Sequence, residues 1–395
     1  MPPLRSLLPR RSSQAIFFLV LLLTTGAFTL PALADYRDSG GGYCCPNYHQ
    51  AIRPGDEIYL VSTRCLPGGC GYQLPVEQMS VMRYDGEAGW LQSSIEEATA
   101  DAPVDCTSIF VHGNWMDRGW AKRRGWAMYH EVTRDWTPDR HIRYIIWSWP
   151  TTPNSKSLAS IRRNNARADA EAYYLGWFLS QLPAEEKVSL SAFSLGASVV
   201  TGALRLQAGG VVVGRSLEEV APRNCRVVFF AGATPTGSFS PYCYGGDAMS
   251  RVERFVNYYN SSDPALKRFW MLEGRGVKAM GYTGAGGLSS EGWAKTTQYN
   301  VSCIMGREHD WNLYACNRCI MDQSREVLRF EEILMPATEP VVTEPVAEEA
   351  DPANAEVAKS DADVNDESPE ESKSDDEATN VELAPAKGSA EATQA

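Results

Sequence analysis

The chain has 395 residues, of which 44% are hydrophobic and 22% are charged, and its formal net charge is −12. This balance lacks the strongly basic composition of nucleic-acid-binding proteins, so no nucleic-acid partner is expected. The charge is uneven along the chain, because residues 336–395 hold 17 Asp or Glu and only three Lys. The part before this acidic stretch is long enough for one large domain.

A signal peptide is predicted at residues 1–34. Three arginines occupy the first 11 residues, and residues 15–30 are almost uninterrupted apolar sequence. Ala32-Leu33-Ala34 then places small residues where a signal peptidase cleaves. The apolar run of 16 residues is shorter than the roughly 20 of a spanning helix. We therefore expect cleavage after Ala34, no stable membrane span afterwards, and export to the periplasm, cell envelope or medium; an uncleaved anchor is the alternative.

Residues 336–395 form a predicted disordered acidic tail. The segment contains no aromatic residue, and its net charge is −14. Such a composition buries too little apolar surface to offset the entropy lost on ordering. Its charge suits contact with cations or basic surfaces, and a solubilising spacer is the simpler interpretation.

Residues 35–335 are expected to form the folded domain, with residues 35–56 as a Cys- and Gly-rich leader. This region contains all ten cysteines. An exported chain meets an oxidising compartment, so the even count predicts disulfides. Cys106 and Cys225 lie inside apolar runs and are interpreted as buried thiols.

Short apolar runs alternate with longer amphipathic segments from residue 57 onward. Strands are predicted at 57–63, 79–84, 108–111, 144–149, 188–193, 226–231 and 255–259, and helices at 120–136, 165–182, 197–206 and 326–334. Alternation of this kind predicts an α/β fold with a mostly parallel central sheet and helices on both faces.

A candidate nucleophile lies between a predicted strand and a predicted helix. The sequence there is Ala192-Phe193-Ser194-Leu195-Gly196. A hydrolase serine projects from a strained turn that needs small residues two positions before and after it. Ser194 also opens the next helix, so the backbone N–H of Leu195 is free to stabilise an oxyanion. A serine that merely caps the helix is the structural alternative.

The second oxyanion donor is expected after an earlier strand. Residues 109–111 are apolar and are followed by His112-Gly113-Asn114. Glycine permits a close approach of the backbone to a substrate, which makes the N–H of Asn114 the candidate donor. We interpret His112 as a residue that braces this loop by hydrogen bonding, and not as the catalytic base.

His309 is the candidate base among five histidines. It follows the last predicted strand and precedes the last predicted helix, where hydrolases of this kind carry their histidine. An imidazole with a pKa near 7 takes the serine proton and returns it to the leaving group. The rival interpretation is a zinc site formed with Cys303, Cys316 and Cys319, because Cys316-x-x-Cys319 has metal-ligand spacing. We expect instead no metal or cofactor, and a disulfide loop that positions His309.

Asp263 is the candidate acid. The strand predicted at 255–259 runs into the polar turn Asn260-Ser261-Ser262-Asp263-Pro264. An aspartate there would accept the imidazole N–H and fix its tautomer. Helix capping is its other interpretation, and the two roles are compatible. Asp247 is the reserve candidate, whereas Asp310 adjoins His309 too closely in sequence to reach its ring.

Together these residues resemble a group of bacterial α/β-hydrolases of unassigned function. The resemblance rests on Phe110-Val111-His112-Gly113, Trp147-Ser148-Trp149-Pro150 and Phe193-Ser194-Leu195-Gly196. Residues 59–64, 260–263 and 308–311 are similar to that group's first strand and to its acid and base loops. The resemblance covers residues 57–311 and implies the α/β-hydrolase fold and the triad, but no substrate. Two positions depart from the group: Phe193 replaces a usual His, and Leu195 replaces a common Met.

The leading functional prediction is an exported serine hydrolase, carboxylesterase-like, that cleaves a small-molecule or lipid-like ester through an acyl-Ser194 intermediate. Thioester and amide cleavage are less favoured. The alternative from another class is a catalytically inactive hydrolase fold that serves as a cell-envelope binding module, for which the 11 Trp would suit carbohydrate contact. A third is the zinc-dependent protein described above.

Overall fold

The computed structural model describes residues 51–68, 74–151, 157–218 and 223–331. The predicted signal peptide, most of the leader and the acidic tail lie outside these residues. By contacts, the chain divides into Met1–Leu334 and Met335–Ala395, and the described residues all belong to the first unit. No helix among them is long and apolar enough to cross a bilayer.

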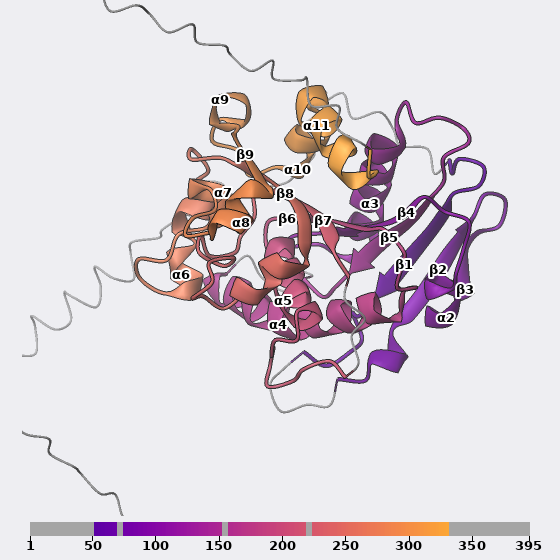
Figure 1. Ribbon diagram of the computed structural model, residues 1–395, viewed down its shortest axis with the longest axis horizontal. Helices are drawn as coiled ribbons and strands as arrows, with labels where there is room; N and C mark the ends of the chain where they lie inside the picture. Colours follow the sequence, from indigo (N-terminus) through magenta and orange to yellow (C-terminus); the bar gives the residue numbers. More distant parts are fainter. Residues whose placement is uncertain (1–50, 69–73, 152–156, 219–222, 332–395) are drawn as a thin grey trace, which may run out of the picture. The chain divides into compact units, whose positions relative to one another are not determined.

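A single nine-stranded sheet forms the centre of the domain (Figure 1). Its strands are β1 (Glu57–Ser62), β2 (Ser80–Asp85), β3 (Gly89–Ser93), β4 (Cys106–Val111), β5 (Ile142–Ser148), β6 (Val188–Phe193), β7 (Cys225–Phe230), β8 (Val252–Tyr259) and β9 (Thr296–Asn300). The order is β3-β2-β1-β5-β4-β6-β7-β8-β9. Only β2 runs antiparallel to its neighbours, and every pair from β1 to β9 is parallel. The predicted fold class is confirmed.

Helices cover both faces of the sheet. The longer ones are α3 (Arg118–Thr133), α4 (Leu158–Gln181), α5 (Gly196–Gln207) and α11 (Arg318–Leu328). The short helices are α2 (Ile95–Thr99), α6 (Trp270–Glu273), α7 (Met280–Thr283), α8 (Ser290–Ala294), α9 (Ser302–Met305), α10 (Trp311–Ala315) and the 3₁₀ turns η1 (Val76–Gln78), η2 (Gly246–Arg251) and η3 (Leu266–Arg268). In Figure 1, α3, α10 and α11 lie on one side of the sheet, and α4 and α5 lie together on the other.

The central strands have no exposed residue, and their sequences lack the strict polar–apolar alternation of half-buried strands. All residues of β4, β5 and β6 are buried, as expected for parallel strands covered on both faces. The tryptophans contribute to this core, because Trp126, Trp147, Trp149 and Trp311 are almost fully buried. Much of the tryptophan surplus therefore packs the interior and does not serve surface contact.

Several elements differ from the sequence prediction: β3 was not predicted, and α4 begins at Leu158 and not at residue 165. The last helix is α11, Arg318–Leu328, and not 326–334. It begins earlier because the Asn317 side chain caps it by accepting from the backbone N–H of Ile320. The edge strand β9 was not predicted, because its sequence, TTQYN, is mostly polar and only partly buried. The carboxyl ends of β4, β6, β7 and β8 lie along one edge of the sheet, where the candidate site is assembled.

Candidate active site

Ser194 occupies a strained turn between β6 and α5. Its φ is +53°, which is unusual for a residue other than glycine. Its N–H donates to the Phe230 carbonyl at 3.1 Å, and its carbonyl accepts from Ala233 at 2.9 Å. A Cβ at Gly196 would stand 2.3 Å from the Val111 carbonyl oxygen. The small residue predicted after Ser194 is therefore required by the close passage of β4.

The structure brings the three predicted triad residues together. His309 Nε2 lies 2.9 Å from Ser194 Oγ, and His309 Nδ1 lies 2.5 Å from Asp263 Oδ2. An ionised carboxylate only accepts hydrogen bonds, so Nδ1–H is the donor and Nε2 of the neutral ring accepts from the serine hydroxyl. Ser194 is 6% exposed and Asp263 is fully buried, whereas the His309 side chain is 21% exposed. Of the three side chains, His309 is thus the most exposed to solvent.

Asp263 combines both of the roles considered for it. Its Oδ1 accepts from the backbone N–H groups of Ala265 at 2.8 Å and Leu266 at 3.0 Å, while Oδ2 faces His309. The two backbone hydrogen bonds hold the carboxylate in the turn before η3, and the four acceptor sites on its two oxygens allow both sets of contacts. The reserve candidate Asp247 lies in η2 and is exposed. Asp310 caps α10, because its Oδ1 accepts from the Asn312 N–H at 3.0 Å.

Asn260 links the acid loop to the base loop, and sequence reasoning gave it no role. The side chain is fully buried. Its Nδ2 donates to the carbonyl oxygens of Gly306 at 3.0 Å and Glu308 at 3.4 Å, and its Oδ1 accepts from the Ser262 N–H at 3.0 Å. One amide therefore holds the turn that carries Asp263 against the segment that carries His309. The signal in the sequence was an Asn at the end of a strand, which is too common to be specific.

The loop after β4 lies in close contact with Ser194. A Cβ at Gly113 would stand 2.9 Å from Ser194 Cβ and 3.0 Å from the Phe193 carbonyl oxygen. The side-chain Oδ1 of Asn114 accepts from Asn164 Nδ2 of α4 at 2.6 Å, which ties this loop to the helix layer. Neither the Asn114 N–H nor the Leu195 N–H donates to any residue within the described ranges. Their assignment as oxyanion donors stays a prediction.

His112 braces the loop as predicted. Its Nδ1 lies 2.8 Å from the Gly113 carbonyl, and its Nε2 accepts from the Trp149 N–H at 3.2 Å. Trp149 returns a bond from its indole N–H to the His112 carbonyl at 2.8 Å. Burial, followed by the charge of nearby Arg64, lowers the pKa of His112 well below its usual value. A neutral ring suits its acceptor role toward Trp149.

Phe193 stacks on the candidate base. The two ring centroids are 5.1 Å apart with an interplanar angle of 29°. The guanidinium of Arg124 lies 5.6 Å from the centroid of the Phe193 ring. Phe193 also contacts Trp311 and Tyr314, which follow His309 in the chain. Phe193, which replaces the usual His of the resembled group, therefore packs against His309 and the helix that follows it.

The three cysteines near His309 differ in their bonding. Cys319 and Cys303 are exposed free thiols. Cys316 is disulfide-bonded, but no disulfide joins two residues of the described ranges. The predicted disulfide loop that positions His309 therefore includes neither Cys303 nor Cys319, and the partner of Cys316 lies outside the described residues. Cys106 and Cys225 are buried free thiols, as interpreted from the sequence. Within the part of the chain that is described, no three His, Cys, Asp or Glu side chains gather as a metal site.

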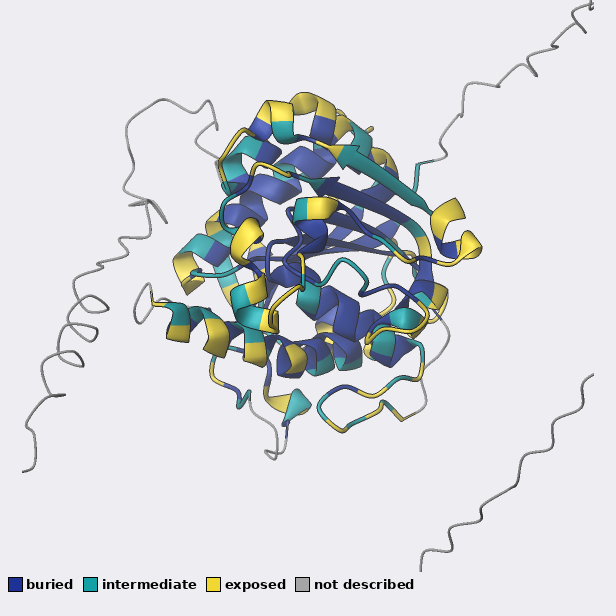
Figure 2. Ribbon diagram, turned by 90° about the vertical axis from the view of Figure 1, so that its left-hand side faces the viewer, coloured by how far each residue is buried: buried dark blue, intermediate teal, exposed yellow. Residues whose placement is uncertain are grey.

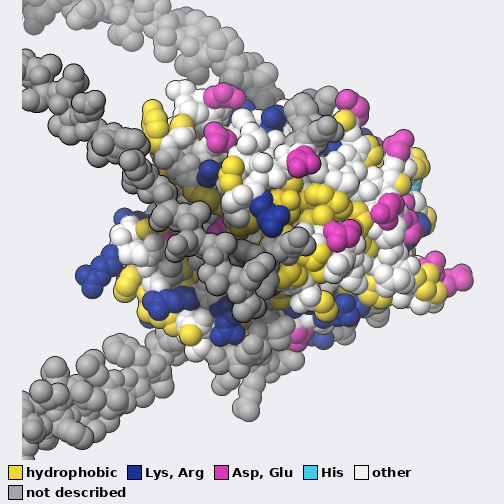
Figure 3. All heavy atoms as spheres, turned by 90° about the horizontal axis from the view of Figure 1, so that it is seen from below, with side chains coloured by type: hydrophobic (Ala, Val, Ile, Leu, Met, Phe, Trp, Pro, Cys, Tyr) yellow, Lys and Arg dark blue, Asp and Glu magenta, His cyan; other side chains and the backbone are white. Residues whose placement is uncertain are grey.

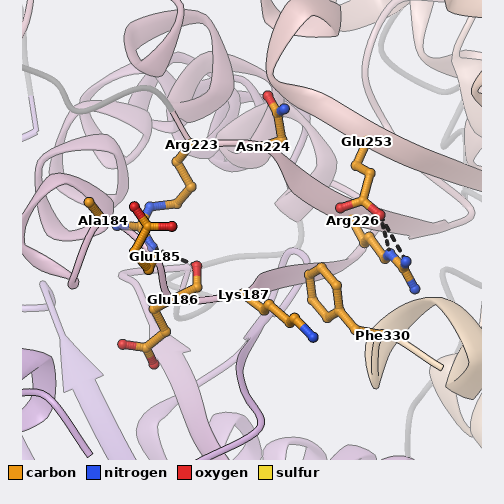
Figure 4. A pocket seen from close by; sticks show the side chains of 9 residues that line it. All are labelled: Ala184, Glu185, Glu186, Lys187, Arg223, Asn224, Arg226, Glu253 and Phe330. Atoms are coloured by element: carbon orange, nitrogen blue, oxygen red, sulfur yellow. Dashed lines mark hydrogen bonds and ion pairs between the residues drawn. The ribbon is translucent and has the colours of Figure 1, made fainter. Parts of the chain in front are cut away.

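A separate cavity of about 350 Å³ opens at the opposite edge of the sheet (Figure 4). It lies beside the amino ends of β6, β7 and β8, and its lining comprises Ala184, Glu185, Glu186, Lys187, Arg223, Asn224, Arg226, Glu253 and Phe330. Within it, Arg226 pairs with Glu253 at 2.8 Å. Because Ser194 follows the carboxyl end of β6, this cavity is distinct from the candidate active site.

The sheet order and the placement of the three side chains define the α/β-hydrolase fold: an elbow serine after a central strand, an acid after β8 and a histidine after β9. No protein-family model matches the chain, and no curated protein matches it significantly.

The solved structures that are similar to this chain include three at low identity. Two are esterase B from Lactobacillus rhamnosis inhibited by C4-C4 tributyrin phosphonate and C6-C4 compounds; each is 12% identical, with TM-scores of 0.32 and 0.33. They cover 72% and 71% of this chain, which in turn covers 89% and 90% of theirs. The third is Zea mays acyl-protein thioesterase 2, 16% identical with a TM-score of 0.31, over 56% of this chain and 92% of that one. Scores this low carry no argument, so the fold assignment rests on the topology of this chain.

Proposed function

We propose that this chain is a serine hydrolase that cleaves carboxylic esters through an acyl-Ser194 intermediate. The observation that carries the proposal is the continuous hydrogen-bonded series from Asp263 through His309 to Ser194. Nucleophilic acyl transfer requires an activated serine, a base and an acid that orients the base. Here the serine is strained, the base lies 2.9 Å from it, and the acid is buried and contacts the base. The proposed steps use side chains and backbone N–H groups of the chain, together with water.

In the first half-reaction, His309 Nε2 takes the proton as Ser194 Oγ attacks the ester carbonyl. The resulting oxyanion accepts from the N–H groups of Leu195 and Asn114, which in the described structure have no other acceptor. Collapse breaks the ester C–O bond, and His309 gives its proton to the departing alcohol. Water then attacks the acyl-enzyme in the same way, with His309 taking the water proton. Collapse releases the acid, and His309 returns the proton to the serine oxygen.

Asp263 acts through His309. Its Oδ2 holds the Nδ1–H, which selects the tautomer with a basic Nε2 and stabilises the imidazolium formed in each step. The two backbone bonds to Oδ1 keep the carboxylate in place while the charge on the ring changes. Each predicted triad residue thus has a defined task in the proposal.

Labelling with a fluorophosphonate probe tests the proposal. We expect the purified chain to be labelled covalently, and Ser194→Ala and His309→Ala to lose the labelling while retaining the far-UV circular dichroism of the parent. His130→Ala, which changes a histidine on α3, is the matched control and should remain labelled. A folded parent that resists the probe would favour the inactive binding-module alternative.

We also propose that the chain is exported, with residues 1–34 as the signal peptide. The proposal is supported by the arginine-rich start, the apolar run and the small residues at positions 32 and 34. Contact of the acidic tail with cations or basic surfaces is part of the same proposal, supported by its net charge of −14.

A further inference from the structure

The connection between β8 and β9 carries a half-exposed tryptophan and four exposed basic residues, and it contacts α4, which carries two more. This connection leaves Asp263 directly and contains η3 and α6. Trp270 is 44% exposed, and Met271, Leu272 and Val277 beside it are partly exposed. We refer to this surface as the basic face; its cations are Arg162 and Arg163 of α4 and Lys267, Arg268, Arg275 and Lys278 of the connection.

The positive charge of the basic face is not compensated locally. None of its six cations forms an ion pair with a residue of the described ranges, although Arg226 and Arg325 elsewhere do. Glu273 is the one carboxylate within residues 265–278, and its Oε1 accepts from Asn165 Nδ2 at 2.5 Å. Asp169, further along α4, accepts from the Tyr244 hydroxyl. In Figure 3, Lys and Arg gather at the left-hand edge, on the side where α6 lies in Figure 1.

The basic face is held in place by the fold. Arg162 Nε donates to the Met271 carbonyl at 3.1 Å, which joins α4 to α6. Arg268 donates to the Pro264 carbonyl at 2.8 Å, next to the acid Asp263. Figure 2 shows the exposed surface of the short helices on this side of the domain. Trp270 therefore lies at the surface on a segment that is hydrogen-bonded to α4 and to the turn that carries Asp263.

We propose that the basic face docks the protein on an anionic lipid surface. Lys and Arg are attracted to anionic headgroups, while Trp and aliphatic side chains enter the boundary between headgroups and acyl chains. A soluble polyanion would engage the cations but would leave Met271, Leu272 and Val277 without a partner. Docking here places the turn that carries Asp263 near the lipid. If the proposed esterase function holds, the substrate class is then an acyl ester presented at a lipid surface.

Vesicle sedimentation with the full chain tests the docking. The vesicles contain phosphatidylglycerol and phosphatidylcholine in equal amounts, or phosphatidylcholine alone, at low ionic strength. We expect binding to the anionic vesicles only, despite the net charge of −12. Lys267→Glu/Arg275→Glu should weaken this binding by at least about 10-fold, and Trp270→Ala should weaken it as well. The control Lys187→Glu/Arg318→Glu makes the same charge change at two exposed positions elsewhere and should bind like the parent.

Three results would overturn the docking proposal. The first is that the parent does not bind anionic vesicles, and the second is that the control variant loses as much vesicle binding as Lys267→Glu/Arg275→Glu. The third is that Trp270→Ala still binds anionic vesicles while the parent binds heparin as strongly as it binds the vesicles. The last result would assign the basic face to a soluble polyanion. Fluorophosphonate labelling separates this proposal from the esterase proposal, because the docking variants should still be labelled and Ser194→Ala should still bind vesicles.

Discussion

At the scale of single residues, the candidate site depends on groups that position the triad as well as on the triad itself. Asn260 is the clearest example, because its buried amide joins the acid turn to the segment just before His309 through two carbonyl oxygens. Loss of these bonds frees the base loop and leaves buried carbonyls without their donor. A displacement of the catalytic base by about 1 Å lowers activity on the order of 100-fold.

We therefore expect Asn260→Ala to lower kcat by roughly 10- to 100-fold while KM changes little. Asn260→Asp retains the size of the side chain but not the Nδ2 donor, so it should be equally impaired. Steady-state kinetics with a short acyl ester measures both constants. Ser261→Ala is the control, because its exposed hydroxyl contacts only Ser302. Normal kcat in Asn260→Asp would show that the amide fills space and does not position the base.

At the scale of elements, a buried ionisable pair joins α4 to the end of β1. Glu171 accepts from Thr63 Oγ1 at 2.5 Å and from Arg167 Nε at 2.8 Å. Arg167 in turn donates to the Leu66 carbonyl at 2.8 Å. Burial raises the pKa of Glu171 to about 7, against the lowering effect of Arg167. Folding therefore favours the protonated carboxyl, and the unfolded chain favours the ionised one above its ordinary pKa of 4.5.

The stability contributed by Glu171 is consequently complete below pH 4.5 and falls as pH rises toward about 7. We expect the free energy of unfolding of the parent, relative to Glu171→Gln, to fall by on the order of 2 kcal/mol between pH 5 and pH 8. Urea unfolding at the two pH values measures it. Glu185→Gln, at an exposed position outside this network, is the control. A difference that is flat with pH would show that Glu171 stays ionised in the folded protein.

The elements best predicted from the sequence are those whose local pattern determines them. Residues 188–193 form β6 as predicted, because their sequence, VSLSAF, joins apolar residues with small serines that a fully buried parallel strand accommodates. Strand β9 was missed because its pairing with β8, and not its composition, makes it a strand. The order of Ser194, Asp263 and His309 could be read along the chain, but Asn260, whose partners lie 46 and 48 residues away, could not.

At the scale of the whole molecule, the two ends of the chain carry most of the uneven charge: residues 1–34 are positive and residues 336–395 are strongly negative. The predicted processing removes residues 1–34, and we expect the exported chain to begin at Asp35. N-terminal sequencing of the protein recovered from outside the cytoplasm checks this. Retention of Met1 in a membrane fraction would indicate an uncleaved anchor.

The central claim is that Ser194 becomes acylated during turnover. Its test is rapid mixing with a p-nitrophenyl ester of a short acid, followed by acid quench and peptide mass mapping. We expect one acyl group on the peptide that contains Ser194 in the parent, and none in Ser194→Ala. Ester hydrolysis without an adduct at Ser194, or with the acyl group on another residue, would contradict the proposed mechanism.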